Sequence, residues 1–248
     1  MRPTLRFLIS ARKDTETFFR FAHDARYDGG RTFRAAVLRM FPAVQRYRLQ
    51  KVAWTFDRSA IVELVSIEYC KQSAVMQKNV RLYRKNWEKI EDQFFDACEA
   101  LFSRVRWPHG RYVAYPTIWG MYPRFLEDKT FHVPYRNRSK RAVNVIIAHE
   151  MLHFLFYHYF FRTHPKLRSD RHEFFVWHVS EIFNAVVQNS PAWLEVFHEK
   201  TPSYPEHRQI VASLQARYGG HQPWTVDELV RDIMKHVRAS SRLQKDSV

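Results

Sequence analysis

The stretch IIAHEMLHFLFYHYF, residues 146–160, places two histidines and a glutamate in the most apolar part of the chain. On a helix, residues four apart lie on one face, one turn apart, so His149 and His153 direct their imidazoles at a single point. Glu150 stands beside them. Because a carboxylate buried without a partner is strongly destabilising, we expect these side chains to share a partner such as a metal ion.

The spacing H-E-x-x-H predicts the chemistry of this partner. Such a histidine pair binds zinc in metalloproteases, and the glutamate acts as a general base. Zinc lowers the pKa of water from about 15.7 to about 7 and polarises the scissile carbonyl. We therefore expect His149 and His153 to be metal ligands for Zn²⁺ and Glu150 to be catalytic.

Two other interpretations remain for this stretch. Histidines in a core are often satisfied by backbone or carboxylate hydrogen bonds. A membrane span over residues 142–161 would carry a glutamate near its midpoint, which is costly, and no second span accompanies it in the sequence. Both leave Glu150 without a role in chemistry.

The motif HEMLH at 149–153, followed by SEIFN at 180–184, resembles the gluzincin clan of zincin metallopeptidases over roughly residues 110–190. The short core is most similar to the minimal gluzincins. This resemblance implies a third zinc ligand from a glutamate on the next helix, and an upstream antiparallel edge strand that holds a peptide. The metzincin pattern is absent, because Phe156 and Tyr159 occupy its glycine and third-ligand positions.

Two glutamates compete for the role of third ligand. The spacing from His153 favours Glu173, but in SDRHEFF the residue Asp170 is expected to cap the helix with Glu173 as its capping-box partner. Glu181 lies in mid-helix within VWHVSEIFNAVV, where a carboxylate needs a strong partner. We expect Glu181 to be the ligand. A histidine ligand, His164 or His172, would indicate a basic, DNA-directed zincin of the SprT-like type instead.

Further polar residues near these helices are candidates for supporting roles, with packing or surface exposure as the alternative for each. The candidates for stabilising an oxyanion or contacting substrate are Tyr157, His158, His164, His172 and His178. Candidate donors next to Glu181 are Ser180 and Asn184. A thiol that masks the zinc in a latent form would be Cys70 or Cys98, for which structural burial is the alternative.

The elements that must position these residues follow from hydrophobic periodicity. Residues 1–105 are expected to be a mostly helical N-terminal region, 106–190 a zincin-like catalytic core, and 191–248 a helical C-terminal region. Within the core, 110–135 predicts two or three strands. The expected fold is α+β, with a small antiparallel sheet and an HExxH active-site helix. Expected helices cover 14–27, 31–41 up to Pro42, the run 59–102, 139–161, 170–188, 204–218, and 224–237 with a Thr225–Glu228 capping box.

Composition indicates the size of the core and the compartment of the protein. The chain has 248 residues, 46% of them hydrophobic, and can bury a sizeable core. Its two cysteines fit a reducing compartment, and the apolar run LRFLIS is too short for a secretory signal, so we expect a cytoplasmic protein. No transmembrane segment is expected, and the oligomeric state stays open.

The net charge of +15 is spread along the chain without a dense block or a nucleic-acid-binding motif. We expect solvated basic faces, and at most weak, salt-sensitive and sequence-independent nucleic acid binding. The expected partner is a peptide or protein substrate. The alternative function is that of a basic binding protein with a structural or vestigial zinc site, and Glu150 argues against it because a structural site needs no general base.

Overall fold

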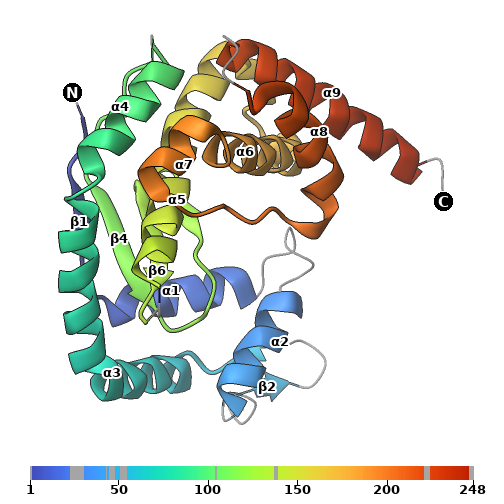
Figure 1. Cartoon of the computed structure of the whole chain (residues 1–248). Helices are drawn as coiled ribbons and strands as arrows, with labels where there is room; N and C mark the ends of the chain where they lie inside the picture. Colours follow the sequence, from blue (N-terminus) through green and yellow to red (C-terminus); the bar gives the residue numbers. More distant parts are fainter. Residues whose placement is uncertain are drawn as a thin grey trace. The chain divides into compact units, whose positions relative to one another are not determined.

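A computed structural model describes residues 2–22, 31–42, 44, 48–50, 55–103, 105–136, 139–220 and 224–245. The fold is α+β, with a small sheet and many helices (Figure 1). The chain forms two compact units. The helical unit comprises Met1–Pro3, Asn86–Gly110 and Ser139–Val248, and the sheet unit comprises Thr4–Lys85 and Arg111–Arg138. Each unit is therefore built from separate stretches of chain. The regions expected from the sequence, 1–105, 106–190 and 191–248, are instead three consecutive ranges.

A four-stranded sheet, in the order β1-β4-β6-β5, forms the centre of the sheet unit. Its strands are β1 (Leu5–Phe7), β4 (Tyr112–Thr117), β5 (Arg124–Phe125) and β6 (Thr130–Pro134). The expected antiparallel sheet is wrong in this respect: β4 pairs in parallel with β1 and β6, and only β5–β6 is antiparallel. The segment between β4 and β6 is long enough to return the chain to the start of β4, which allows the parallel pairing.

Three of the described helices belong mainly to the sheet unit, namely α1 (Ala11–Ala22), α2 (Arg31–Met40) and α3 (Arg58–Trp87). A two-stranded antiparallel ribbon joins β2 (Arg48–Gln50) to β3 (Thr55–Phe56). The predicted end of a helix before Pro42 is confirmed, since α2 ends at Met40. Phe18, Trp119 and Ile61 are buried together in the core of this unit.

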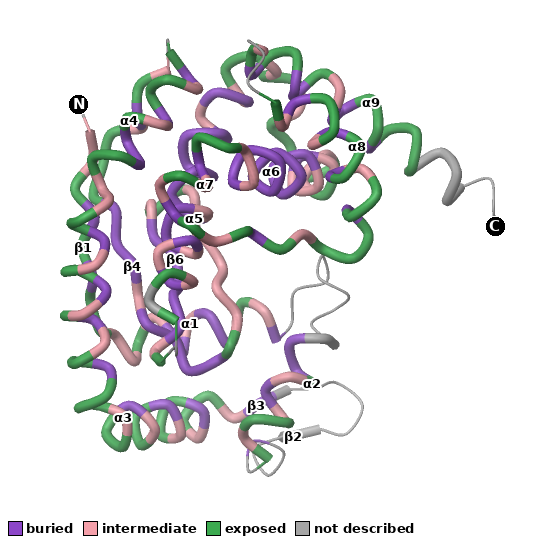
Figure 2. The backbone as a smooth tube through the Cα atoms, viewed as in Figure 1, coloured by how far each residue is buried: buried purple, intermediate pink, exposed green. Residues whose placement is uncertain are grey.

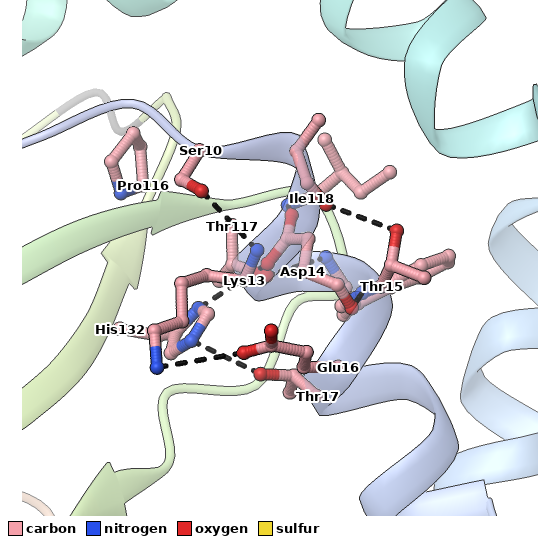
Figure 3. A network of polar contacts seen from close by, with 12 residues as sticks. Ser10, Lys13, Asp14, Thr15, Glu16, Thr17, Pro116, Thr117, Ile118 and His132 are labelled. Atoms are coloured by element: carbon pink, nitrogen blue, oxygen red, sulfur yellow. Dashed lines mark hydrogen bonds and ion pairs between the residues drawn. The ribbon is translucent and has the colours of Figure 1, made fainter. Parts of the chain in front are cut away.

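A buried polar network lies between α1 and the sheet (Figure 3). Asp14 and His132 are each 0% exposed. The Oδ2 atom of Asp14 accepts hydrogen bonds from the Tyr69 hydroxyl at 2.8 Å and from the Ile118 backbone N–H at 2.9 Å. Its Oδ1 atom lies 3.3 Å from His132 Nδ1, and His132 Nε2 lies 3.1 Å from Thr17 Oγ1. No local spacing in the sequence predicts this network, because its residues lie far apart along the chain.

The described helices of the helical unit begin with α4 (Glu91–Leu101), α5 (Lys140–Thr163) and α6 (Glu173–Gln188). They continue with α7 (Pro191–Phe197), α8 (Arg208–Tyr218) and α9 (Val226–Lys245). Helix α6 contacts α5, α7, α8 and α9, and most of its length is buried (Figure 2). Its apolar residues on all sides suit this central position. Among the described helices, none has the length and apolar character to cross a membrane.

Local capping explains where the helices near the site begin. The Ser139 hydroxyl accepts a hydrogen bond from Ala142 N–H at 3.1 Å and caps α5. The predicted Thr225–Glu228 capping box at α9 is confirmed by reciprocal side-chain to backbone hydrogen bonds. The predicted Asp170 cap is wrong. Asp170 begins a separate 3₁₀ turn, so α6 starts three residues later, and its N-cap is His172, whose side chain makes no capping hydrogen bond.

Candidate metal centre

The side chains of His149, His153 and Glu181 converge in the helical unit. His149 Nε2 lies 3.1 Å from Glu181 Oε2, and His153 Nε2 lies 3.3 Å from Glu181 Oε1. The two Nε2 atoms are 3.0 Å apart. Each residue offers one ligand atom, and these atoms all lie within 4.8 Å of one another. Within the described ranges, this is the one group of three or more His, Cys, Asp or Glu side chains placed to hold a metal ion.

Two packed helices bring these residues together. His149 and His153 lie one turn apart on α5, so their rings are close, with centroids 4.6 Å apart. Glu181 comes from α6, which packs against α5. Because α6 is apolar around Glu181, the carboxylate is held in the contact between the helices, where it is 5% exposed.

The same face of α6 carries two amides that support α5. Asn184 Nδ2 donates a hydrogen bond to the backbone carbonyl of His149 at 2.9 Å. Gln188 Nε2 donates to the carbonyl of Val145 at 3.3 Å, which turns Gln188 Oε1 toward His149 Nδ1 at 2.7 Å. The proton of neutral His149 is therefore held at Nδ1, and its Nε2 keeps a lone pair that faces Glu181 and His153. Asn184 acts as the donor that the sequence predicted, although to the backbone.

Burial and charge act in opposite directions on His149. Burial alone would lower its pKa, but the hydrogen bond to Glu181 and the negative charges of Glu181 and Glu150 outweigh burial and raise the pKa of His149. Glu150 is itself 6% exposed and follows His149 directly on α5. The carboxylate of Glu150 is thus close enough to act electrostatically on the first histidine without belonging to the three converging ligands.

The chemistry of these side chains fits a zinc ion. Two imidazoles and one carboxylate are a common set of three protein ligands at catalytic zinc sites, which keep a further position open. The two Nε2 atoms are 3.0 Å apart, so both can bind one ion when each presents its lone pair. The carboxylate then compensates the charge of the ion.

The other candidates for third ligand lie outside this group. Glu173 is the first residue of α6, and His172 is the N-cap of that helix. His164 follows the last residue of α5, and its Nδ1 atom lies 2.8 Å from Thr163 Oγ1. The structure brings Glu181 to the two histidines and leaves Glu173, His164 and His172 apart from them.

Tyr157 and Ser180 contact each other across α5 and α6, with their hydroxyl oxygens 3.1 Å apart. The Ser180 hydroxyl also donates to the backbone carbonyl of Trp177 at 2.8 Å. The rings of Tyr157 and His153 have centroids 6.0 Å apart. The two hydroxyl groups therefore link α5 to α6, and neither belongs to the group of converging ligands.

The two cysteines do not join the described metal-binding group. Cys98 is fully buried in α4, where burial raises the pKa of its thiol well above the usual range. Cys70 is exposed on α3 in the sheet unit. Cys98 therefore has the properties of a structural cysteine.

Two polar residues of the helical unit were missed by the sequence analysis. Gln188 lies seven residues after Glu181, and this helical spacing is the signal that could have identified it. His207, which contacts His178, lies on a distant segment, and no pattern in the sequence links the two histidines. His158, another candidate, is half-buried on α5, and burial lowers its pKa.

Comparison of the chain with protein-family models, with curated proteins and with solved structures finds no match in any of the three.

Proposed function

We propose that this protein is a zinc-dependent peptidase of the gluzincin type. The observation that carries the proposal is the convergence of His149 Nε2, His153 Nε2 and a Glu181 oxygen within 4.8 Å, directly beside Glu150. Three such ligands with an adjacent glutamate are what zinc-dependent hydrolysis requires. The substrate that the resemblance to gluzincins implies is a peptide or protein.

The residues of the chain have distinct roles in this proposal. His149, His153 and Glu181 would hold the ion, which supplies Lewis-acid activation of water and of the scissile carbonyl. Glu150 accepts a proton from the attacking water and passes it to the leaving amine. Gln188 holds the His149 proton at Nδ1, and Asn184 fixes the backbone of His149. The low exposure of these side chains strengthens each electrostatic interaction among them.

A second candidate function is that of a basic binding protein with a structural or vestigial metal site. The observation that favours it is the net charge of +15. Because the charge is scattered, it supports only weak and salt-sensitive binding to nucleic acid, without base readout. Tight, sequence-specific binding that persists at high salt would instead support this second function.

The deciding experiment separates chemistry from metal binding at Glu150. Purified protein is analysed for zinc and assayed on a mixed peptide library, together with the variants Glu150→Gln and Glu173→Gln. We expect about one zinc per chain in all three proteins. Turnover should fall at least about 100-fold in Glu150→Gln and remain near normal in Glu173→Gln, because the proposal assigns the proton transfer to Glu150.

Two outcomes would contradict the peptidase function. The first is near-normal hydrolysis by a fully metallated Glu150→Gln variant. The second is a zinc-loaded wild-type protein that cleaves no member of the library, which would favour a structural metal site.

A further inference from the structure

A second pair of histidines lies in the helical unit, apart from the candidate metal centre. His178 belongs to α6, and His207 ends the 3₁₀ turn Pro205–His207 that leads into α8. His178 Nδ1 and His207 Nε2 are 2.7 Å apart, and the ring planes are inclined by 77°. Two imidazole nitrogens from separate elements therefore meet at one point.

The surroundings of this pair keep both imidazoles neutral. Burial lowers the pKa of His178 and of His207, so both rings are uncharged near pH 7 and each carries one nitrogen with a lone pair. The aromatic rings of Trp177 and Tyr204 flank His207, with centroids 5.7 Å and 5.6 Å from its own. His207 itself is 3% exposed, so its position is well defined by packing.

Two carboxylates add a negative field at the same place. The charges of Glu206 and Glu181 act on both imidazoles. Glu206 precedes His207 and is exposed, and Glu181 lies one turn after His178 on α6. A neutral pair of nitrogen ligands in a negative field favours a cation over an anion.

We propose that His178 and His207 form a second, weaker site for a divalent metal ion, with His178 Nδ1 and His207 Nε2 as ligands. Imidazole ligands suit Zn²⁺, Cu²⁺ and Ni²⁺, whereas Mg²⁺ and Ca²⁺ prefer oxygen. Nitrogens bound to one tetrahedral zinc at about 2.0–2.1 Å lie about 3.3–3.4 Å from each other, so the two rings need to separate by well under 1 Å. Water completes the coordination, and Glu206 compensates the charge.

The proton balance of this step is simple. In the metal-free pair, one of the two facing nitrogens carries the hydrogen of the contact. When the metal binds, this hydrogen is taken up by the other nitrogen of the same ring. Both rings remain neutral, and no net proton leaves the protein at neutral pH. The site therefore needs only a shift of tautomer.

This second site uses different ligands from the candidate metal centre, and the two share only the charge of Glu181. It offers two protein ligands, whereas the candidate metal centre offers three, so the two classes of site should differ clearly in affinity. Calorimetric titration of the metal-free protein with Zn²⁺ alone should show about one equivalent of tightly bound zinc. A further equivalent should bind at least about 100-fold more weakly.

Substitution of each histidine assigns the two classes. His178→Gln and His207→Gln should each weaken the second class at least about tenfold and leave the first unchanged. His158→Gln is the matched control, since His158, like His178, is half-buried with a lowered pKa, and it should leave both classes unchanged. The double variant His149→Gln/His153→Gln should lose the first class and keep the second, which separates this inference from the proposed function.

A spectroscopic measurement covers the case in which His207→Gln fails to fold, as circular dichroism would reveal. Cu²⁺ bound to the His149→Gln/His153→Gln variant should show hyperfine coupling to two nitrogens in electron paramagnetic resonance, and one of them should disappear on adding His178→Gln. Absence of the weak class from the wild-type protein would overturn the inference. So would its persistence without His178, and either result would leave the pair as a hydrogen bond only.

Discussion

Among the residues that the structure describes, two clusters combine a histidine with a buried carboxylate, one in each unit. In the sheet unit, Asp14 accepts hydrogen bonds from a hydroxyl and from a backbone N–H, and it also faces His132. In the helical unit, Glu181 faces the Nε2 atoms of His149 and His153. Both carboxylates are almost fully buried, so burial does not distinguish a structural network from a metal site.

The type of atom around each carboxylate does distinguish them. In the sheet unit, the hydrogen bonds pair a hydrogen with a lone pair. Asp14 Oδ2 accepts from the Tyr69 hydroxyl and from the Ile118 N–H, and His132 Nε2 pairs with the Thr17 hydroxyl (Figure 3). The protein itself thus supplies the partners. In the helical unit, Gln188 accepts the Nδ1 proton of His149, which leaves a lone pair at His149 Nε2 facing Glu181 and His153 Nε2. Two imidazole nitrogens and a carboxylate oxygen gathered in this way are a ligand set that a cation such as Zn²⁺ can complete.

The largest expected effect is the loss of zinc binding when both histidine ligands are replaced, with the Asp14–His132 cluster left intact. His149→Gln/His153→Gln should lower zinc affinity at least about 1,000-fold, because both nitrogen ligands are lost. Equilibrium dialysis with a zinc indicator measures this change. The comparison variant His132→Gln should retain the affinity of the wild type per folded chain, and a loss of zinc there would erase the distinction between the clusters.

Asp14→Asn should have the largest effect on folding. The substitution removes the charge of Asp14 from the buried contact with His132 and places an amide opposite the Ile118 N–H. It should therefore lower the free energy of unfolding by about 3–5 kcal/mol. Urea denaturation of metal-free protein measures it. Zinc affinity should stay unchanged where the variant is folded. A stability within about 1 kcal/mol of the wild type would show that the network is dispensable.

The next largest effect tests which glutamate of α6, Glu181 or Glu173, is the third zinc ligand. Glu181→Ala should weaken zinc binding about 100-fold, since it removes the oxygen ligand and its charge. Glu173→Ala should change the affinity less than about twofold, because Glu173 lies outside the converging group. Competition with a chelator of known affinity measures both. The reverse pattern would place the third ligand at the start of α6.

A smaller effect is expected from the amide behind His149. Gln188→Leu should weaken zinc binding about tenfold, because the His149 proton is no longer held at Nδ1. Gln188→Glu keeps an oxygen acceptor there and should retain most of the affinity. The same chelator competition applies, and equal losses in the two variants would indicate that packing, rather than the hydrogen bond, accounts for the effect.

The smallest effect concerns pH and the pair His178–His207. Burial lowers the pKa of both residues below the usual value of 6.5, so the unfolded chain binds protons here at a higher pH than the folded one. Their contribution to stability is therefore present above about pH 6.5 and is lost as the pH falls toward the folded pKa values. Denaturation of metal-free protein at pH 7.5 and 5.5 should show a smaller pH dependence in His207→Gln than in the wild type. An unchanged dependence would argue against neutral, buried imidazoles.

Much of the candidate site follows from the sequence because it depends on local helical geometry. The i, i+4 spacing places His149 and His153 on one face of α5, and the apolar setting of Glu181 correctly indicated which glutamate lies near them. The start of α6 was wrong because the capping residues form a 3₁₀ turn of their own, and sequence alone does not distinguish these two uses of Asp170.

Long-range pairing could not be predicted in the same way. Strand β1 was expected to lie in a helical region, and its parallel pairing with β4 joins residues about a hundred positions apart, for which no local pattern exists. The contact of Asp14 with His132 has the same character, since it depends on that sheet. The contact of His178 with His207 likewise depends on how α6 packs against α8.

The row formed by Glu181, Asn184 and Gln188 on α6 makes the site sensitive to insertions and deletions in an uneven way. One residue added or removed between Glu181 and Gln188 rotates the rest of the helix by about 100°, which would turn the amides away from α5 together. A length change in the connection over residues 164–172 leaves that row intact. Chains that build this site should therefore vary in the length of the connection while keeping the residue count along α6 fixed.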